Sequence, residues 1–444
     1  MTADPPPALA ETGPPPEGLL LPPPTALVNH PLRDRVVSEM HMRRMPALTP
    51  PMLMAQVVRL IEPADIGPER AHAAAMPGVP RQEASPTARH LAGRAAGDIE
   101  YAWERHSEAT TATVFLPRRD ADVFAPRAED AEALSWLGSA PGGVIRAVKV
   151  GIVATEAEAE SLALSIGFSE PDLVSCRIGR IRIWSDFLLH GDGYGRLLIA
   201  ANGTPPSDLG RIVQRIQEVG NYRNMALLGL PVAQEQSRLV AEAEERLVAI
   251  TARMAEGEGD RGLLDALCEL SSEVASINAA TAFRMSATAA YTSIALDRLH
   301  SLPQQPIDGY PTLEEFTERR LLPAARTCES FSRRLEALAA RIERATSLLR
   351  TRVEMGVQDT NLALLRSMTE NAARQVKLQK LVEGFSVMAV SYYAVGLIFY
   401  LLKAVAPPGL GSPELLVGLL VVPVFLAVLL YMRAKVRRID DGRE

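Results

Sequence analysis

The sequence predicts an α+β cytosolic domain, followed by a long helical bundle or stalk and a C-terminal transmembrane hairpin of two helices. Three observations lead to this fold class. Segments rich in β-branched residues alternate with helical patterns up to about residue 205. From residue 206 onward the pattern is almost entirely helical. Two apolar runs without charged residues, 385–402 and 415–432, lie near the C-terminus.

Composition sets the first limits. The 444 residues allow two to three domains, and the net charge of −6 gives no basic bias toward a nucleic-acid partner. Cys176, Cys268 and Cys328 are far apart and form no CxxC pair, so we expect no disulfide framework, zinc site or other cofactor. Residues 1–26 form a Pro-rich leader that we expect to be disordered, and they lack the pattern of a secretory signal.

The expected α+β domain covers residues 27–205. Partly alternating runs rich in Val, Ile and Thr predict strands at 53–61, 109–116, 143–153, 174–189 and 194–200. Helical patterns lie between them at 85–100, 127–138 and 156–168. The turn HGDGYG at 190–195 should close an antiparallel hairpin between the last two strands.

Residues 206–384 should form the helical bundle and the stalk. Ser207 and Asp208 resemble an N-cap pair in front of the first helix, and Pro231 should break or kink the chain after it. Further helices are predicted at 232–255, 260–300 and 312–382. The last helix has no proline after Pro323 and continues into the first apolar run, so one long helix should enter the membrane.

The two apolar runs predict transmembrane helices at 385–406 and 415–432, joined by an outer loop at 407–414. About 20 apolar residues suffice to cross the hydrocarbon core. A buried helical hairpin in a soluble protein is the alternative. Basic residues precede the first run and follow the second, in a tail at 433–444, so both termini should be cytoplasmic. The expected location is the bacterial inner membrane, with the lipid bilayer as a partner.

One face of the long helix carries small and polar residues when heptads are counted back from the membrane. This seam includes Asn361, Gln375, Gln379, Ser386, Tyr393, Gly396 and Tyr400. The opposite face within the membrane, which includes Val387 and Val390, suits lipid contact. Two alternatives stay open: the seam packs within one subunit, or it joins copies of the chain in a homo-oligomer. In the second case the polar axis could line a conducting path.

A polar cluster precedes the strand predicted at 109–116. It contains Trp103, Glu104, Arg105 and His106. Adjacent residues of a strand point to opposite faces, so Glu104 and His106 should share a face. Acid–base chemistry is one hypothesis for this pair, and an ordinary ion pair or domain contact is the other. No GxSxG, HExxH or DxDxDG pattern occurs in the chain.

A second cluster, in residues 29–48, contains His30, Arg33, His41 and Arg43, which are candidates for binding a ligand or partner. The two histidines are eleven residues apart, which matches no common metal-ligand spacing, so we expect no metal site.

Four segments resemble a bacterial family of uncharacterised membrane-anchored proteins, a domain of unknown function. They are NHPLRDRVVSEMHMRRMPAL, WERHSEATTATVFLP, GRIVQRIQEVGNYRNMALLGLP and LQKLVEGFSVMAVSYYAVGLIFYLLKA. The resemblance covers nearly the whole chain beyond the leader. The family tends to show a His-Ala-Arg-Pro run where this chain has residues 41–44. It implies membrane anchoring but no established activity.

The order of parts also resembles CorA-type divalent-cation transporters, which are homopentamers whose long helix lines the pore. Glu414 matches the carboxylate of their outer loop, whereas their Gly-Met-Asn signature is absent and LLKAVAPPG stands in its place. The resemblance implies ion transport, although the known filter does not carry over. Lys403, near the expected pore mouth, would repel cations.

These observations favour a non-enzymatic, membrane-anchored protein with a cytosolic binding or scaffold domain and a self-associating stalk. A CorA-like transporter or channel without the Gly-Met-Asn filter is the alternative. A membrane-tethered enzyme that uses Glu104 and His106 is a third hypothesis. The sequence leaves the protein or small-ligand partner of the cytosolic domain open.

Overall fold

A computed structural model describes residues 29–33, 36–37, 45–79, 88–257, 259–405 and 413–440 of the chain. The predicted leader at 1–26 and residues 407–412 of the predicted outer loop lie outside these ranges. The chain divides into two compact units. Unit 1 comprises Met1–Glu244 and Glu273–Leu338, and unit 2 comprises Glu245–Ser272 and Ala339–Glu444. Unit 1 thus extends beyond residue 205, where the sequence places the end of the sheet domain.

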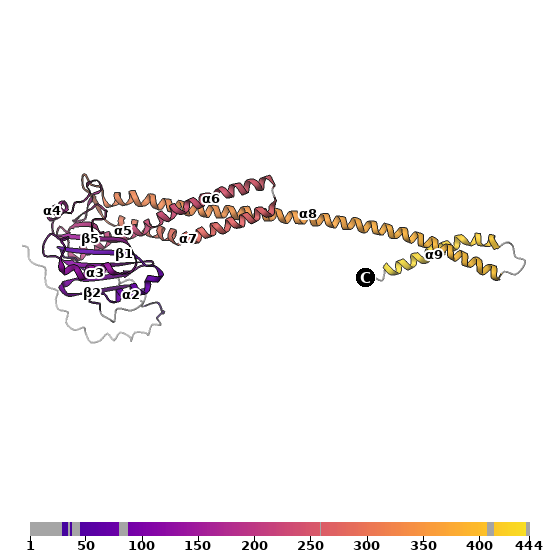
Figure 1. Ribbon diagram of the computed structural model, residues 1–444, viewed down its shortest axis with the longest axis horizontal. Coiled ribbons are helices and arrows are strands. Elements are labelled where there is room, and N and C mark those ends of the chain that lie inside the picture. The colour runs from indigo at the N-terminus through magenta and orange to yellow at the C-terminus, as the bar shows by residue number, and fades with distance from the viewer. Residues whose placement is uncertain are drawn as a thin grey trace, which may run out of the picture. The chain divides into compact units, whose positions relative to one another are not determined.

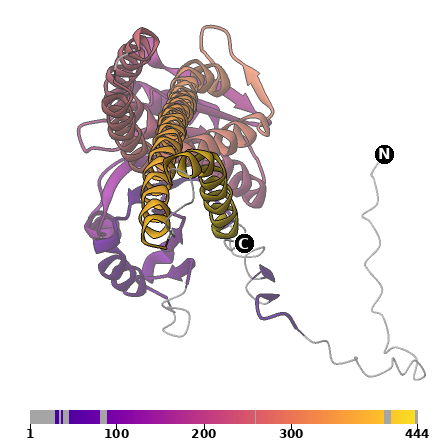
Figure 2. The same cartoon turned by 90° about the vertical axis from the view of Figure 1, so that its right-hand side faces the viewer.

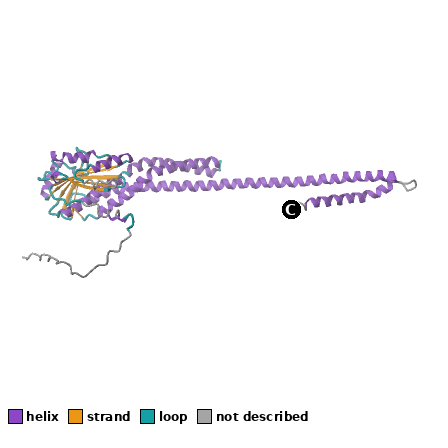
Figure 3. Cartoon of the chain, turned by 90° about the horizontal axis from the view of Figure 1, so that it is seen from below, coloured by secondary structure: helices purple, strands orange, loops and turns teal. Residues whose placement is uncertain are grey.

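Unit 1 is built on one mixed sheet of nine strands, which Figure 3 shows in orange. The strand order is β2-β3-β4-β1-β5-β8-β7-β6-β9. All neighbouring strands are antiparallel except β5 and β8, which are parallel. The strands are β1 (Met52–Leu60), β2 (His90–Arg94), β3 (Glu100–Arg105), β4 (Ala109–Pro117), β5 (Gly143–Val153), β6 (Val174–Ile178), β7 (Ile181–Ser185), β8 (Gly195–Ala200) and β9 (Gln304–Pro306).

Helices cover both faces of the sheet, so its strands are buried on two sides (Figure 1). On one face, α5 (Pro206–Leu227) packs over Val148, Val150 and Ile152 of β5. The other face is covered by α2 (Ile66–Ala74), α3 (Ala131–Ser139) and α4 (Glu156–Ile166). Side chains alternate between these two cores along each strand, as the period of two requires. In β8, for example, Leu197 and Ile199 face α5, whereas Leu198 and Ala200 face α4.

The strands predicted at 53–61, 109–116, 143–153 and 194–200 are confirmed as β1, β4, β5 and β8. The helices predicted at 127–138 and 156–168 are confirmed as α3 and α4. The predicted hairpin is also present, since β7 pairs with β8 in antiparallel register. The single strand predicted at 174–189 is wrong, because β6 and β7 form a hairpin that turns at Gly179 with a positive φ of 61°.

The helix predicted at 85–100 is wrong within the described residues. Residues 90–94 form β2, which pairs with β3 and brings Leu91 opposite Trp103. Both side chains are buried against the core under α2 and α3. Gly93 approaches the neighbouring loop so closely that a Cβ there would lie 2.5 Å from the carbonyl oxygen of Pro77. Tertiary burial therefore overrides the local helical pattern of this segment.

Most of the described residues beyond β8 are helical, as predicted, and β9 is an exception. The helices are α6 (Gly229–Glu256), α7 (Asp260–His300), α8 (Leu313–Val405) and α9 (Pro413–Asp440). The predicted N-cap at Ser207 and Asp208 is wrong, because α5 begins at Pro206 and neither side chain caps it. Proline suits this first helical position, where its missing N–H has no helical partner. The break near Pro231 is confirmed, since α5 ends at Leu227 and α6 starts at Gly229.

Helix α8 is one continuous helix of 93 residues. Within unit 2, its residues Ile342, Ala345 and Leu349 are buried, as are Leu247 of α6 and Leu267 of α7. Every residue from 354 to 382 is exposed. The helix thus leaves its packed environment shortly after Leu349, and over residues 354–382 no other described residue covers it.

The part of α8 toward its C-terminus is apolar. In the described residues, Leu313–Leu401 is the one helix long and apolar enough to cross a membrane, judged by length and composition, and this is weak support for membrane association. Helix α9 contributes a shorter apolar stretch, Val421–Ala434. The end of α8 and α9 lie side by side in Figures 1 and 2.

A buried ion pair anchors α3 beside the sheet. Arg118 follows β4 and donates two hydrogen bonds to Asp130, at 2.9 and 2.7 Å. Its Nε donates to the carbonyl oxygen of Val123 at 3.1 Å. The side chains of Arg118 and Asp130 are only 1% and 3% exposed, so water cannot replace either partner. A pair of this kind is costly to break, because removal of one partner leaves the other charge buried.

Asp130→Ala should therefore lower the free energy of unfolding of unit 1 by about 3–5 kcal/mol. Denaturant titration followed by tryptophan fluorescence measures this, since Trp103, Trp136 and Trp184 all lie in unit 1. Asp120→Ala is the matched control, because its bidentate pair with Arg127 is on the surface and should contribute little. Equal losses in the two variants would contradict this account of α3.

Candidate functional site

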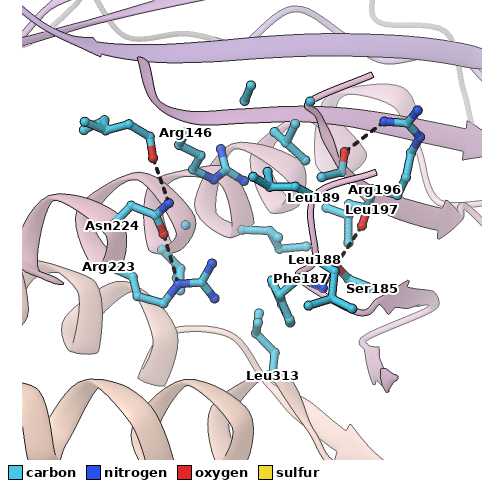
Figure 4. Close-up of a pocket in the computed structure, with 18 of the residues that line it drawn as sticks. Arg146, Ser185, Phe187, Leu188, Leu189, Arg196, Leu197, Arg223, Asn224 and Leu313 are labelled. Carbon is cyan, nitrogen blue, oxygen red and sulfur yellow. Dashed lines mark hydrogen bonds between the residues drawn. The ribbon is translucent and has the colours of Figure 1, made fainter. Parts of the chain in front are cut away.

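The main candidate site is a pocket of about 190 Å³ in unit 1, between β5, α5 and the loop that joins β7 to β8 (Figure 4). Its position follows from the sheet. Strand β8 begins at Gly195, opposite Val148 of β5, so Val144–Ala147 have a strand neighbour only on the β1 side. The space beside these four residues is left free of a strand, and the pocket occupies it.

A β-bulge shapes the wall of this pocket. Val58 and Arg59 of β1 pair with Arg146 and Val144 of β5, so Ile145 is the extra residue. Its carbonyl oxygen accepts a hydrogen bond from Nδ2 of Asn224 on α5, at 3.2 Å. Bulges redirect neighbouring side chains and are frequent next to functional sites. Here the bulge precedes Arg146, the one charged residue that β5 directs toward α5.

Arg146 is bound only by neutral groups. Its Nη1 donates to the side-chain oxygens of Gln56 and Asn221, at 3.0 and 2.8 Å. Its Nη2 donates to that of Gln217 at 2.9 Å. Gly220 makes room for the guanidinium, since a Cβ there would lie 2.7 Å from Nη2. Three of the five N–H groups of Arg146 thus donate to amide oxygens, and none of these oxygens balances its charge.

Arg223, one turn along α5 from Gly220, makes fewer described hydrogen bonds than Arg146. Its Nε donates to Oδ1 of Asn224 over a long 3.4 Å, and its guanidinium lies 4.6 Å from the ring centre of Phe187. Among the described residues, Nη1 is buried without a hydrogen-bond partner. Arg223 lies four residues before Leu227, the last residue of α5, so it precedes the last turn, in which the helix dipole acts most strongly.

Phe187 is held in an unusual backbone conformation. Its φ is +56°, which is rare for a bulky side chain and often marks a functional site. Oγ of Ser185 accepts the N–H of Phe187 at 3.2 Å, and Oδ1 of Asp186 accepts that of Leu188 at 3.1 Å. The ring is thereby fixed between Arg223 and Phe316, on which it stacks at 4.4 Å between centroids. The guanidinium of Arg320 lies over the ring of Phe316, 3.9 Å from its centroid.

Arg196, the third cation among the described lining residues of the pocket, is paired. Arg196 and Lys149 both bind Oδ2 of Asp192, at 2.8 and 2.7 Å. Burial opposes ionisation of Asp192, but hydrogen bonds from Arg196, Lys149 and the N–H of Tyr194 outweigh it and hold the pKa of Asp192 well below its usual range. Arg146 and Arg223 are thus the two cations without a carboxylate among the described lining residues.

Burial and like charge act on both guanidinium groups. Burial, followed by the charge of Arg223, lowers the pKa of Arg146 to about 9. Burial, followed by the charge of Arg320, lowers the pKa of Arg223 to about 10. Both groups still carry their charge at neutral pH, so the pocket holds two uncompensated positive charges. An anion is the ligand that such a site can stabilise.

Two of the four residues of the predicted cluster at 103–106 line a second, smaller pocket, and the described contacts of the cluster are as follows. Trp103 is buried and donates to Oε1 of Glu69 at 2.5 Å. Glu104 and His106 share a face, as expected, with 3.9 Å between Oε1 and Nδ1. Nε2 of His106 lies 3.0 Å from Oγ1 of Thr111. Trp103 and Glu104 line a second pocket, of about 80 Å³, whereas Arg105 and His106 do not line it.

The second predicted cluster is not brought to either pocket in the described residues. His30 and Arg33 are exposed, and Nη1 of Arg33 donates to Oδ1 of Asn29. His41 and Arg43 lie outside the described residues.

The helix seam lies in unit 2 and is mostly exposed. Tyr393 and Tyr400 are 74% and 72% exposed, and Asn361, Gln375 and Gln379 are exposed as well. Ser386 and Gly396 are half-buried. Glu414 is in the first turn of α9. Val387, which the sequence pattern assigns to lipid, is instead buried, as is Ser391 one turn later. The side of α8 that is covered in this chain is therefore not the predicted seam.

The sequence analysis missed Arg146 and Arg223. A signal existed for Arg146, since it interrupts the apolar run GVIRAVKVGIV of a strand that is buried on both faces. No comparable signal marks Arg223, because an arginine on a helix is normally solvated. Only the packing of α5 against the sheet shows that this side chain is enclosed.

Comparison with known proteins gives one match. The chain matches the family described as Protein of unknown function (DUF3422) over residues 28–439. The chain belongs to this family. The predicted resemblance to an uncharacterised family is confirmed, whereas the resemblance of this DUF3422 member to CorA-type transporters stays a prediction. No curated protein and no solved structure matches the chain.

The strained loop yields a testable prediction. Phe187→Gly and Phe187→Ala both remove the ring, but glycine adopts a positive φ without steric cost. The glycine variant should therefore be the more stable of the two by about 1 kcal/mol in denaturant titrations. Leu189 of the same loop is the control, since its φ is not positive and alanine should be the more stable replacement there. The same order at both positions would contradict strain at Phe187.

Proposed function

We propose that this protein is a non-enzymatic, membrane-anchored binding protein whose sheet unit takes up an anionic ligand and whose long helix self-associates. One observation carries the binding role: two half-buried arginines, Arg146 and Arg223, face one pocket without a carboxylate among its described lining residues, and Nη1 of Arg223 is buried without a hydrogen-bond partner. Burying a charge without a counter-charge is costly, and a protein tolerates that cost where a ligand completes the site.

The lining of the pocket favours binding over chemistry. Ser185 is the one hydroxyl among the described lining residues, and it already donates to the carbonyl oxygen of Arg196 at 2.7 Å. No histidine, cysteine or carboxylate is among the described residues that line it. A nucleophile would need such a neighbouring base for activation. Arg146, Arg223 and Asn224 can orient a bound anion, which is the work of a binding site.

Membrane anchoring is supported by the apolar end of α8. In this part of unit 2, large apolar side chains such as Phe385, Val390 and Leu397 are exposed. A helix surface of this length that is apolar and exposed is unfavourable in water, and contact with lipid would remove it from water. The basic residues around the two apolar stretches favour cytoplasmic termini and the bacterial inner membrane.

Self-association is supported by the exposed middle of α8. Residues 354–382 have no partner in the described chain, although several large apolar side chains lie among them, including Leu365, Met368 and Val382. Isolated helices are marginal in water, so a helix of this length gains stability from neighbours. A second copy supplies the same seam, with polar residues Gln375 and Gln379 to fix the register.

Charges placed in the apolar stretch should test the anchor. Val390→Lys combined with Leu397→Lys should release the full-length chain from membranes during an alkaline carbonate wash, since each lysine costs about 3 kcal/mol near the centre of a spanning helix. Val357→Lys with Leu364→Lys is the matched control, with the same residue types, spacing and exposure in the preceding part of α8. Equal retention of the two double variants, or a soluble unsubstituted protein, would overturn the anchor.

Cysteine cross-linking should test the seam. With Cys268, the exposed native cysteine, changed to serine, Gln379→Cys should form disulfide-linked dimers in membranes. Lys377→Cys, on the opposite side of the helix, should not. The readout is the dimer fraction on non-reducing gels after mild oxidation. Equal cross-linking at the two positions, or none at either, would contradict self-association along this face.

A further inference from the structure

We propose that the ligand of the pocket between β5, α5 and the β7–β8 loop is a small apolar monocarboxylate. Its carboxylate is bound by Arg223 beside Arg146, and its apolar body contacts Phe187, Leu188 and Ile216. This assignment rests on the proposed anion-binding role and adds the chemical class of the ligand.

The number of free donors favours a carboxylate. Arg146 gives three of its five N–H groups to amide oxygens, so it offers a ligand its charge and at most two further hydrogen bonds. The described hydrogen bond of Arg223 comes from Nε alone, which leaves Nη2 for a ligand and, after a small shift of the side chain, the buried and unpartnered Nη1 as well. One guanidinium edge matches the two oxygens of one carboxylate by two parallel N–H···O bonds.

A phosphate group would find few donors here besides the two guanidinium groups. It carries up to two charges and three terminal oxygens, which usually recruit several backbone N–H groups or a helix N-terminus. Arg223 lies at the C-terminal end of α5, where carbonyl groups predominate. Nδ2 of Asn224 is committed to Ile145, and the hydroxyl of Ser185 to Arg196. The site thus suits a single, planar negative charge.

The remaining walls select an apolar body. Side chains of the loop and of α5 form one side of the pocket, and Leu313 lies below them in Figure 4. Leu188 and Leu189 are exposed, so apolar surface continues beyond the enclosed part. Benzene fits a cavity of about 150 Å³ in another protein. The 190 Å³ here has room for a ring or short branched chain together with its carboxylate.

Calorimetric titration of the full-length protein in detergent solution tests the proposal. The probes are benzoate, its neutral counterpart benzamide, and inorganic phosphate, all at one ionic strength. We expect benzoate to bind and benzamide to bind at least about tenfold more weakly, because charged hydrogen bonds contribute about that factor or more. Binding of phosphate but not of benzoate would overturn the apolar carboxylate and leave the anion-binding role standing. Binding of neither anion would overturn both.

Benzoate binding by three variants distinguishes binding in the pocket from nonspecific binding elsewhere on the protein. Arg223→Met should weaken benzoate binding by roughly tenfold to a hundredfold, and it should not lower the unfolding temperature of the ligand-free protein, since it removes an unbalanced buried charge. Gly220→Ala keeps both charges but displaces Arg146, and it should weaken binding as well. Arg211→Met is the control, because Arg211 lies on the exposed side of α5 and pairs with Asp208.

The variants also offer a second way to refute the proposal. If Arg223→Met bound benzoate as tightly as the unsubstituted protein, the pocket would not be the binding site. If Arg223→Met instead lowered the unfolding temperature as strongly as a core substitution, Arg223 would be a structural residue and the assignment would fall. Weakened binding in Arg211→Met would show that the effect is not specific to the pocket.

Discussion

Two guanidinium groups that share one pocket without a counter-charge set the main constraint on this structure. A charge in a low-dielectric interior must be paired, hydrogen-bonded or neutralised. An uncompensated buried charge destabilises the folded state by several kcal/mol. The protein meets part of this cost with neutral groups. Amide oxygens on β1 and α5 satisfy Arg146, and the ring of Phe187 covers Arg223. Neither device supplies negative charge, and this is the observation behind the proposed anion site.

The contrast with other enclosed arginines of the same unit strengthens this argument. Arg118 is fully paired with Asp130, and Arg284 binds both carboxylate oxygens of Glu108, at 2.9 and 2.6 Å. Arg182 reaches Glu156 and Glu160. These three arginines show that the fold can place a carboxylate beside an enclosed arginine. Arg59 is another exception, since it is buried and donates to the carbonyl oxygens of Leu137 and Gly138, but unlike Arg146 and Arg223 it does not line the pocket beside β5.

Several local irregularities meet at this gap. The late start of β8 opens the space, and the bulge at Ile145 breaks the ladder beside it. Phe187 adopts a positive φ, and Gly220 lacks the side chain that would displace Arg146. Each feature costs stability in isolation, and folded proteins usually concentrate such costs at functional sites. Unit 2 has a different character, because its helix α8 exposes apolar surface that is suited to lipid and to other copies of the chain.

The elements that could be predicted correctly from the sequence are those with long periodic patterns. The continuity of α8 and the strands β1, β4 and β5 could be predicted, because their patterns repeat over many residues and local preference agrees with burial. The strand at 90–94 could not be predicted, because its side chains become buried only when β3 pairs with it. The candidate site, like this strand, could not be predicted from the sequence. Arg146 and Arg223 come from distant segments, and the charge around them depends on every element that encloses the pocket. Sequence patterns record local periodicity, whereas desolvation and the lack of a counter-charge exist only once the sheet and α5 are packed together.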